Sequence, residues 1–272
     1  MKSSSENAFT KINVPVVSSG VLRWDAAMSQ GGIPRGKIVE IFGDTSTGKS
    51  ALCLTIAKSF LDMGEEVFYI DCDILIDTAE WINRLGCHKL LHDDRIVYPL
   101  STEFAFDHLL QLASFADCII LDSASALIPY AELNGGKHNY KTIPRMMNRA
   151  IQQLIPIIKK SGCTIIFTSQ IRYDKQGNLK SNGGEALEHN AALRLELSIE
   201  KYIQETRDNN GNLDYKGMTV RFNTIKNTIG TSDLVIAPFY FGYDMPAGFE
   251  QVENENEFRQ RYGLPIKQER IK

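Results

Sequence analysis

The chain has 272 residues, of which 43% are hydrophobic and 23% charged, and its formal net charge is −3. These values are typical of a globular protein, and they exclude a uniformly basic surface, so any nucleic-acid site has to be a local patch. The polar N-terminus does not resemble a signal peptide, and no apolar run approaches the roughly 20 residues that cross a bilayer. We therefore expect an intracellular, cytoplasmic protein with no membrane contact.

Residues 1–17 predict an N-terminal segment that is loosely held at its start. An apolar run at 38–42 then precedes a glycine-rich loop and a helical pattern from Ser50 to Met63. A strand, a Gly-Lys-Ser loop and a helix in this order indicate a phosphate-binding P-loop. The predicted nucleotide ligands are Gly43, Asp44, Thr45, Ser46, Thr47, Gly48, Lys49 and Ser50. In such a loop Lys49 reaches the outer phosphates, and the Ser50 hydroxyl binds Mg²⁺.

Apolar runs and helical patterns alternate after the loop. The predicted strands cover 67–71, 95–100, 118–122 and 163–168, and the predicted helices cover 77–85, 102–115 and a long segment from 142. Because these strands are continuously apolar, both faces are expected to be buried in a mostly parallel sheet with helices on both sides. Runs at 192–197, 218–224 and 234–240 predict an antiparallel extension at the C-terminal side. The folded core is expected to span residues 18–245, and residues 246–272 are expected to form a short C-terminal tail.

Polar residues follow several of these strands, where parallel sheets gather their sites. Asp122 ends an apolar strand and is the expected carboxylate near Mg²⁺. Asp71 and Asp73 offer a carboxylate that orients or deprotonates the attacking water, and only one of them is expected to point into the site. The alternative for this pair is a solvated or helix-capping role. Gln170 is placed to hydrogen-bond the γ-phosphate and to report its loss.

Two polar, glycine-flanked segments at 133–141 and 171–184 are predicted to be mobile loops. Their cations would contact phosphates and their aromatic residues would stack on bases, although two solvated loops are an equal alternative. The cations are Lys137, Lys141, Arg172, Lys175 and Lys180. The five cysteines form no CxxC pair and are expected to be buried, reduced thiols.

Several ordered motifs together resemble the RecA family of recombinases over about residues 14–242. The matching stretches are Gly31 to Gly43 before the loop, Asp122 to Pro129, Arg145-Met146-Met147, Phe167 to Arg172, Gly183 to Leu187, and Arg194-Leu195-Glu196. The resemblance implies a RecA-like P-loop NTPase of the α/β class. Its compact length, without the family's N-terminal helix and large C-terminal domain, resembles the recombinases of phages, which implies a bacterial cell or a phage-infected host.

The resemblance also assigns roles to single residues. Asp73 aligns with the family's catalytic carboxylate, and Lys49 and Gln170 complete the catalytic set. Asp77 lies near the adenine, Trp81 near the position of a stacking aromatic, and Lys226 aligns with a lysine that reaches the ATP of the neighbouring subunit. The residues implied to hold DNA are Arg145, Arg172, Gly183, Gly184 and the lysines of both loops.

The resemblance implies a DNA-dependent ATPase that uses ATP and Mg²⁺. Its partners would be single-stranded DNA, homologous duplex DNA and further copies of itself in a helical filament, with residues 1–17 as the oligomerisation arm. Three departures from the family pattern are Asp73 for a glutamate, Thr228 for a second lysine and Glu188-His189-Asn190 after the second loop. The shorter Asp73 implies slow hydrolysis. The three departures together favour an alternative role as an ATP switch that assists a recombinase or helicase without exchanging strands. A third alternative is an ATPase of the same fold with no DNA role.

Overall fold

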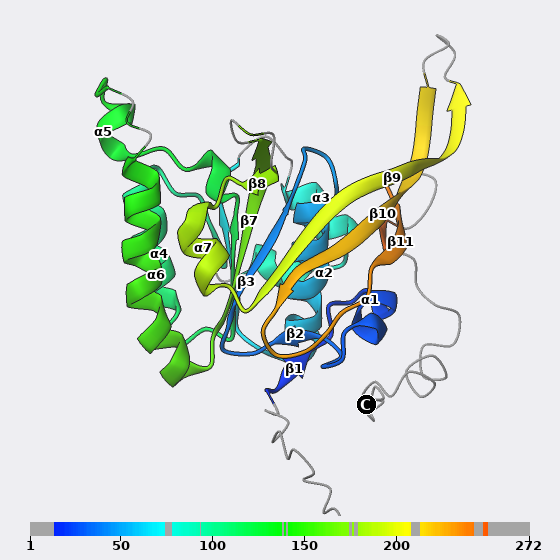
Figure 1. Cartoon of the computed structure of the whole chain (residues 1–272), viewed down its shortest axis with the longest axis horizontal. Helices are drawn as coiled ribbons and strands as arrows, with labels where there is room; N and C mark the ends of the chain where they lie inside the picture. The colour runs from blue at the N-terminus through cyan, green and yellow to red at the C-terminus, as the bar shows by residue number, and fades with distance from the viewer. Residues whose placement is uncertain are drawn as a thin grey trace, which may run out of the picture.

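The computed structural model describes residues 14–73, 78–92, 94–137, 139, 141–173, 176, 179–207, 213–241 and 247–249. Its main feature is a ten-stranded sheet in the order β12-β11-β10-β9-β3-β7-β6-β4-β5, with β8 paired to β7 (Figure 1). The parallel part contains β3 (Ile38–Gly43), β4 (Val67–Asp71), β5 (Ile96–Val97), β6 (Cys118–Asp122) and β7 (Thr164–Tyr173). The antiparallel part contains β10 (Leu213–Asn227), β11 (Val235–Tyr240) and β12 (Gly248–Phe249). β9 (Leu193–Arg207) joins the two, because it pairs parallel with β3 and antiparallel with β10.

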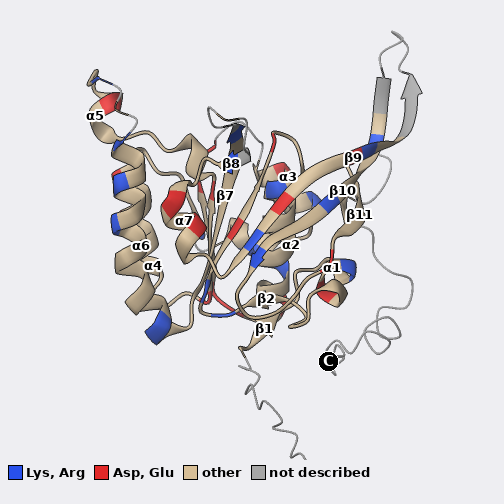
Figure 2. Cartoon of the chain, viewed as in Figure 1, with Lys and Arg blue, Asp and Glu red and all other residues tan. Residues whose placement is uncertain are grey.

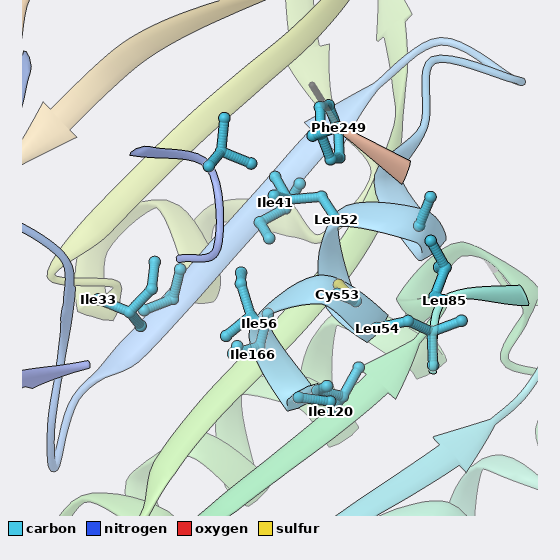
Figure 3. Packing of buried hydrophobic residues seen from close by; sticks show 14 of the residues in the cluster. Ile33, Ile41, Leu52, Cys53, Leu54, Ile56, Leu85, Ile120, Ile166 and Phe249 are labelled. Atoms are coloured by element: carbon cyan, nitrogen blue, oxygen red, sulfur yellow. The ribbon is translucent and has the colours of Figure 1, made fainter. Parts of the chain in front are cut away.

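Two buried clusters lie on opposite faces of this sheet. The first packs α1 (Leu22–Ala27), α2 (Lys49–Asp62) and α3 (Thr78–Arg84) against the strands. Figure 3 shows Leu52, Cys53 and Ile56 of α2 beside strand residues such as Ile41, Ile120 and Ile166. The second cluster contains α4 (Thr102–Leu112), α6 (Thr142–Ser161) and α7 (Gly184–Asn190). Burial on both faces explains the continuous apolar strands and confirms the predicted α/β fold class.

The remaining elements are short. β1 (Val16–Val17) and β2 (Ile33–Pro34) form a separate antiparallel pair near the start of the described chain. Two 3-10 turns, η1 (His88–Leu91) and η2 (Ala124–Ala126), and the one-turn helix α5 (Tyr130–Leu133) connect the larger elements. Among the residues that the structure describes, no helix has both the length and the apolar character of a transmembrane span.

Several predicted boundaries were wrong. β5 has two residues instead of six, because only Ile96 and Val97 pair with β4. β7 continues beyond Gln170 to Tyr173 and pairs with β8 (Leu179–Ser181), so the predicted loop at 171–184 contains two paired strands before helix α7. β9 and β10 extend to 15 residues each and form a long arm (Figure 1). These two long strands pair mainly with each other. Their outer residues therefore lack the apolar pattern of a buried sheet, and the predicted strands were too short.

The prediction of buried free thiols was confirmed for four of the five cysteines. All five cysteines are free; four are buried and Cys72 is half-buried. Burial raises the pKa of Cys87 and of Cys163 to about 12, which keeps both as thiols at neutral pH.

Candidate nucleotide site

A cavity of about 530 Å³ opens at the carboxyl ends of β3, β4, β6 and β7. Its polar wall contains Thr45, Ser46, Gly48, Lys49, Ser50, Asp71, Asp73, Asp122, Ser123 and Gln170, and its apolar wall contains Leu54, Trp81, Met218, Phe239 and Phe241. The volume is within the range of ligand pockets, and the lining offers polar groups suited to phosphates and aromatic side chains suited to a base. We call the part lined by Trp81, Phe239 and Phe241, whose rings contact one another in series, the aromatic end. The structure thus gathers the predicted catalytic and metal-binding residues in one cavity.

The loop before α2 has the conformation that a phosphate cradle requires. Gly48 is left-handed, with φ of 89°, and precedes the first residue of α2, while Ser46 also has a positive φ of 62°. A Cβ atom on Gly43 would lie 2.3 Å from the Leu197 carbonyl oxygen of β9, so only glycine fits there. The backbone N–H groups of the loop and the start of α2 together favour an anion.

Lys49 points back onto its own loop. Its ammonium group donates to the Asp44 carbonyl at 2.6 Å and to the Gly43 carbonyl at 3.2 Å. Burial lowers its pKa, and the negative charges of Asp122 and Asp44 oppose that shift. A partly desolvated ammonium whose acceptors in the described part of the chain are carbonyls is suited to exchange them for phosphate oxygens.

Asp122 is fixed by two hydroxyl groups beneath the cavity. The Tyr69 hydroxyl donates to one carboxylate oxygen at 2.5 Å, and the Thr168 hydroxyl donates to the other. Next to it, the buried Ser123 hydroxyl lines the cavity and has no hydrogen-bond partner among the described residues. An oriented carboxylate, an unpaired hydroxyl and Ser50 on one wall fit a hydrated Mg²⁺ ion and the phosphates that it would bind.

Both Asp71 and Asp73 line the cavity, so the expectation that only one would face it was wrong. Residues two apart along a strand direction point to the same side, and Asp73 lies just beyond the end of β4. Asp71 is buried and accepts a hydrogen bond from the Thr78 hydroxyl at 2.6 Å and from the Asp73 N–H at 3.2 Å. Asp73 is only half-buried and is therefore the more accessible of the two.

Burial raises the pKa of Asp71 to about 6, with a further contribution from Asp122, although the Thr78 hydrogen bond opposes the shift. Because this pKa lies above its unfolded value, the group stabilises the folded state fully at low pH, and that contribution is lost as pH rises through about 6. We expect the free energy of unfolding of the wild type to fall relative to that of Asp71→Asn as the pH rises from the ordinary pKa of 3.8 to about 6. Urea unfolding of both proteins at a series of pH values measures the difference, and parallel curves would contradict the prediction.

The aromatic end of the cavity contains Trp81, whose ring stacks on Phe239 with centroids 6.0 Å apart. The Arg84 guanidinium lies over the same indole at 4.9 Å. Phe239, Phe241, Met218 and Tyr202 also line the cavity, from the antiparallel strands and the segment after them, and sequence reasoning missed them. Alternation within 218–224 and 235–240 marks one face of these strands as buried, but no local motif connects that face to the P-loop.

Trp81 gives this end of the cavity a spectroscopic signal. The chain has two tryptophans, and the other, Trp24, is fully buried and does not contribute to the described cavity lining. We expect saturating ATP to change the tryptophan emission of a Trp24→Phe variant, because a base that enters this end displaces water from Trp81. A fluorescence titration with ATP, with the ribose triphosphate lacking a base as control, measures the effect. Equal changes with both ligands would contradict contact with the base.

Gln170 lies where the cavity meets the β7–β8 hairpin. Its N–H donates to the Ser125 hydroxyl at 2.8 Å, and its carbonyl accepts from the Asn182 N–H at 2.7 Å. Arg172 and Lys180 are exposed, and they form a register pair on the hairpin that starts directly after Gln170. Arg172 comes two residues after Gln170, a group that lines the cavity, and Lys180 pairs with Arg172 on the neighbouring strand.

The other described residues that were predicted to bind DNA do not line the cavity. Lys137, Lys141 and Arg145 are exposed around the start of α6. The start of α6 lies at the same end of the molecule as β8, and Figure 2 shows basic positions along α6 and on β8. Gly183 has a structural role, because an added Cβ would lie 2.5 Å from the Leu187 side chain, whereas Gly184 faces open space with φ of +79°. Lys226 donates to the Glu188 and His189 carbonyls at the end of α7, at 3.0 and 2.8 Å. Lys175 and Asp77 lie outside the described residues.

The strand, loop and helix, the buried Asp122 and the parallel sheet define a P-loop NTPase. Comparison with solved structures supports this fold: a KaiC-like protein, PH0186 from Pyrococcus horikoshii OT3, matches with a TM-score of 0.62 and 18% identity, over 87% of this chain and 98% of its own.

A family profile for the RecA N-terminal domain matches residues 2–239. Curated proteins named Protein RecA from Gloeobacter violaceus and Deinococcus radiodurans are 33% and 34% identical over 81% and 82% of the chain. The chain belongs to the RecA family. It spans 59% and 61% of the length of these two relatives.

Proposed function

We propose that this protein is a DNA-dependent ATPase that forms a filament on single-stranded DNA and promotes homologous pairing and strand exchange. One observation carries the proposal: Gln170 lines the nucleotide cavity and is also the residue from which the basic hairpin extends. Gln170 therefore provides a short physical path between a ligand in the cavity and the two cations Arg172 and Lys180. The two relatives named Protein RecA support the same assignment.

In this proposal, Lys49 and the loop amides bind the triphosphate, and the aromatic end of the cavity takes the base. Ser50 and Asp122 would hold Mg²⁺, which supplies neutralising charge to the phosphates. Asp73, the more accessible carboxylate, orients the attacking water, and the Gln170 amide hydrogen-bonds the terminal phosphate. Because Lys226 does not form part of the described lining, its proposed role is toward the nucleotide of a neighbouring copy.

The test combines three measurements on the same preparation. ATP hydrolysis is measured with and without single-stranded DNA, joint molecules are measured with a homologous duplex, and electron micrographs report filaments. Stimulation by DNA together with joint molecules supports strand exchange. An ATPase rate that does not change with DNA would refute the proposal.

A second candidate function is an ATP switch that binds DNA and assists another protein without exchanging strands. Asp73 favours it, because its carboxylate is one methylene shorter than the glutamate that the family resemblance places there, and it is only half-buried. A carboxylate that has to act through an additional water gives slow hydrolysis. Filaments or DNA binding without joint molecules would identify this function.

A further inference from the structure

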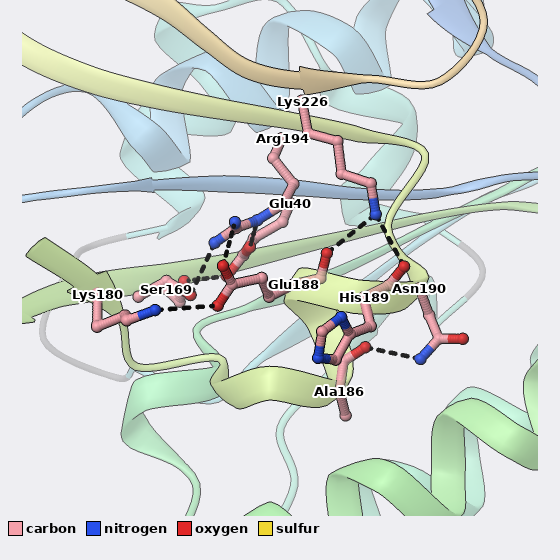
Figure 4. A network of polar contacts seen from close by, with 10 residues as sticks. Glu40, Ser169, Lys180, Ala186, Glu188, His189, Asn190, Arg194 and Lys226 are labelled. Carbon is pink, nitrogen blue, oxygen red and sulfur yellow. Dashed lines mark hydrogen bonds and ion pairs between the residues drawn. The ribbon is translucent and has the colours of Figure 1, made fainter.

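A buried ion pair lies at the foot of the basic hairpin, on the α7 side of the sheet (Figure 4). Glu40 of β3 is fully buried, and its carboxylate accepts from Arg194 Nε at 2.6 Å. The two residues are register partners on neighbouring parallel strands. The second carboxylate oxygen of Glu40 accepts from the Ser169 hydroxyl of β7 at 2.9 Å. One carboxylate thus connects three strands.

Such a pair is a poor means of stabilising a sheet. Removing one partner of a buried pair is strongly destabilising, whereas replacing both partners with apolar residues of similar volume is often neutral or stabilising. Glu40 and Arg194 interrupt strands whose other buried positions are largely apolar. Glu40 and Arg194 also make polar contacts outside the sheet, and an apolar pair in their place could not make these contacts.

Those contacts lead to the return strand of the hairpin and to α7. Arg194 Nη2 donates to the Ser181 hydroxyl at 3.3 Å, and Nη1 lies 3.5 Å from the Glu188 carboxylate. Glu188 in turn lies 3.8 Å from the Lys180 ammonium, one of the two hairpin cations. A Cβ on Gly183 would come within 2.6 Å of the Glu40 carboxylate, so the backbone after the hairpin passes directly against it.

The ion pair therefore holds both ends of the hairpin. Ser169 precedes Gln170 on the outgoing strand, and Ser181 ends the return strand. Gln170 lies between these contacts and the nucleotide cavity, and Glu40 is three residues before Gly43 at the start of the P-loop. A shift at the P-loop or at Gln170 would also move the cluster of Glu40, Arg194 and their partners. The reason is that short hydrogen bonds in a close-packed interior stretch very little.

We propose that Glu40 and Arg194 are positioning residues that couple occupation of the nucleotide cavity to the arrangement of the β7–β8 hairpin and α7. The proposal deepens the proposed function and rests on it for the identity of the ligands. The two residues do not line the described cavity, so they act through Gln170 and the hairpin and not on the nucleotide itself.

The decisive variant is the double replacement Glu40→Leu with Arg194→Met. We expect it to fold with a melting temperature no lower than that of the wild type and to bind a non-hydrolysable ATP analogue. In the wild type, the analogue should slow hydrogen exchange in 169–184 and raise affinity for a fluorescent oligothymidine by about 10-fold, an ordinary coupling. In the double variant both responses should fall below about 2-fold.

The matched control is Glu200→Leu with Arg221→Met, which removes an exposed pair between β9 and β10 with Nε–O at 2.8 Å. It should leave both responses at wild-type values. If the double variant does not fold, Ser181→Ala removes the hairpin contact alone and should reduce the exchange response. A response that stays at the wild-type value in the folded double variant, or in Ser181→Ala, overturns the proposal.

The two readouts also separate this inference from the proposed function. If the analogue alters exchange in the wild-type hairpin but the protein does not bind oligothymidine, the proposed function fails while the coupling stands. If the protein binds oligothymidine and the analogue leaves the exchange of 169–184 unchanged, the inference about Glu40 and Arg194 fails while the DNA function stands.

Discussion

Replacement of Lys49 with alanine is expected to lower the rate of ATP hydrolysis at least about 100-fold, the scale seen when one preorganised donor to a developing charge is removed. The Lys49 ammonium lies in the cavity, with only loop carbonyls as its hydrogen-bond acceptors in the described structure. It is therefore available to the phosphates and already partly desolvated. Phosphate release under saturating ATP, with single-stranded DNA present, measures the effect.

The control for this prediction is Lys58→Ala on the same helix. Lys58 is partly exposed and forms an i,i+4 pair with Asp62, a kind of contact that contributes little to stability. We expect its rate to stay within about 2-fold of the wild type, since surface changes away from a site have small effects. A Lys49→Ala protein that keeps a tenth or more of the wild-type rate would contradict the assignment of this lysine.

Replacement of Trp24 with alanine is expected to lower the free energy of unfolding by about 3–5 kcal/mol, the range for large-to-small changes of buried aromatic residues. Trp24 is fully buried, its ring centroid lies 5.5 Å from that of Phe222, and its indole N–H donates to the Thr224 hydroxyl at 3.4 Å. It therefore packs α1 against the antiparallel part of the sheet. Urea unfolding followed by circular dichroism measures the loss.

Two further variants make this prediction specific. Trp24→Phe retains a ring against Phe222 and should lose clearly less stability than the alanine variant. Trp81→Ala removes the half-buried tryptophan of the cavity, and it should impair nucleotide binding more than it impairs folding. A loss below about 1 kcal/mol for Trp24→Ala would mean that α1 does not depend on this contact.

Sequence reasoning could predict the part of the site that is specified by residues adjacent in the chain. Gly43 to Ser50 specify the loop. Asp122 and Gln170 each follow an apolar run in the sequence, and the topology of a parallel sheet brings both to one edge, although Gln170 lies within β7. Trp81 was placed near the cavity by the resemblance to the RecA family and not by this topology. The loop, Asp122 and Gln170 carry local signals, because the chemistry of each depends on the element that immediately precedes it.

The parts that sequence reasoning missed depend on pairing between distant segments. The Phe239 wall of the cavity exists only because the antiparallel strands bring β11 into the same buried cluster as the P-loop helix, where Phe239 stacks on Trp81 of α3. The hairpin after Gln170 was predicted as a loop. Its paired positions include the cations Arg172 and Lys180, so its sequence lacks the alternation of apolar and polar residues that predicts a strand. Similarly, Glu40 reads as an interruption of a strand until Arg194 is placed opposite it.

The central position of β3 has a consequence for how the protein acquires activity during synthesis. Its two neighbours, β7 and β9, begin at residues 164 and 193, so the strand that carries the P-loop is completed by segments translated far later. Contacts this distant in sequence form slowly and late, because the intervening chain has to be closed first. We expect nascent chains that end before β9 to bind no nucleotide, and competence for ATP to arise only once the C-terminal half has left the ribosome.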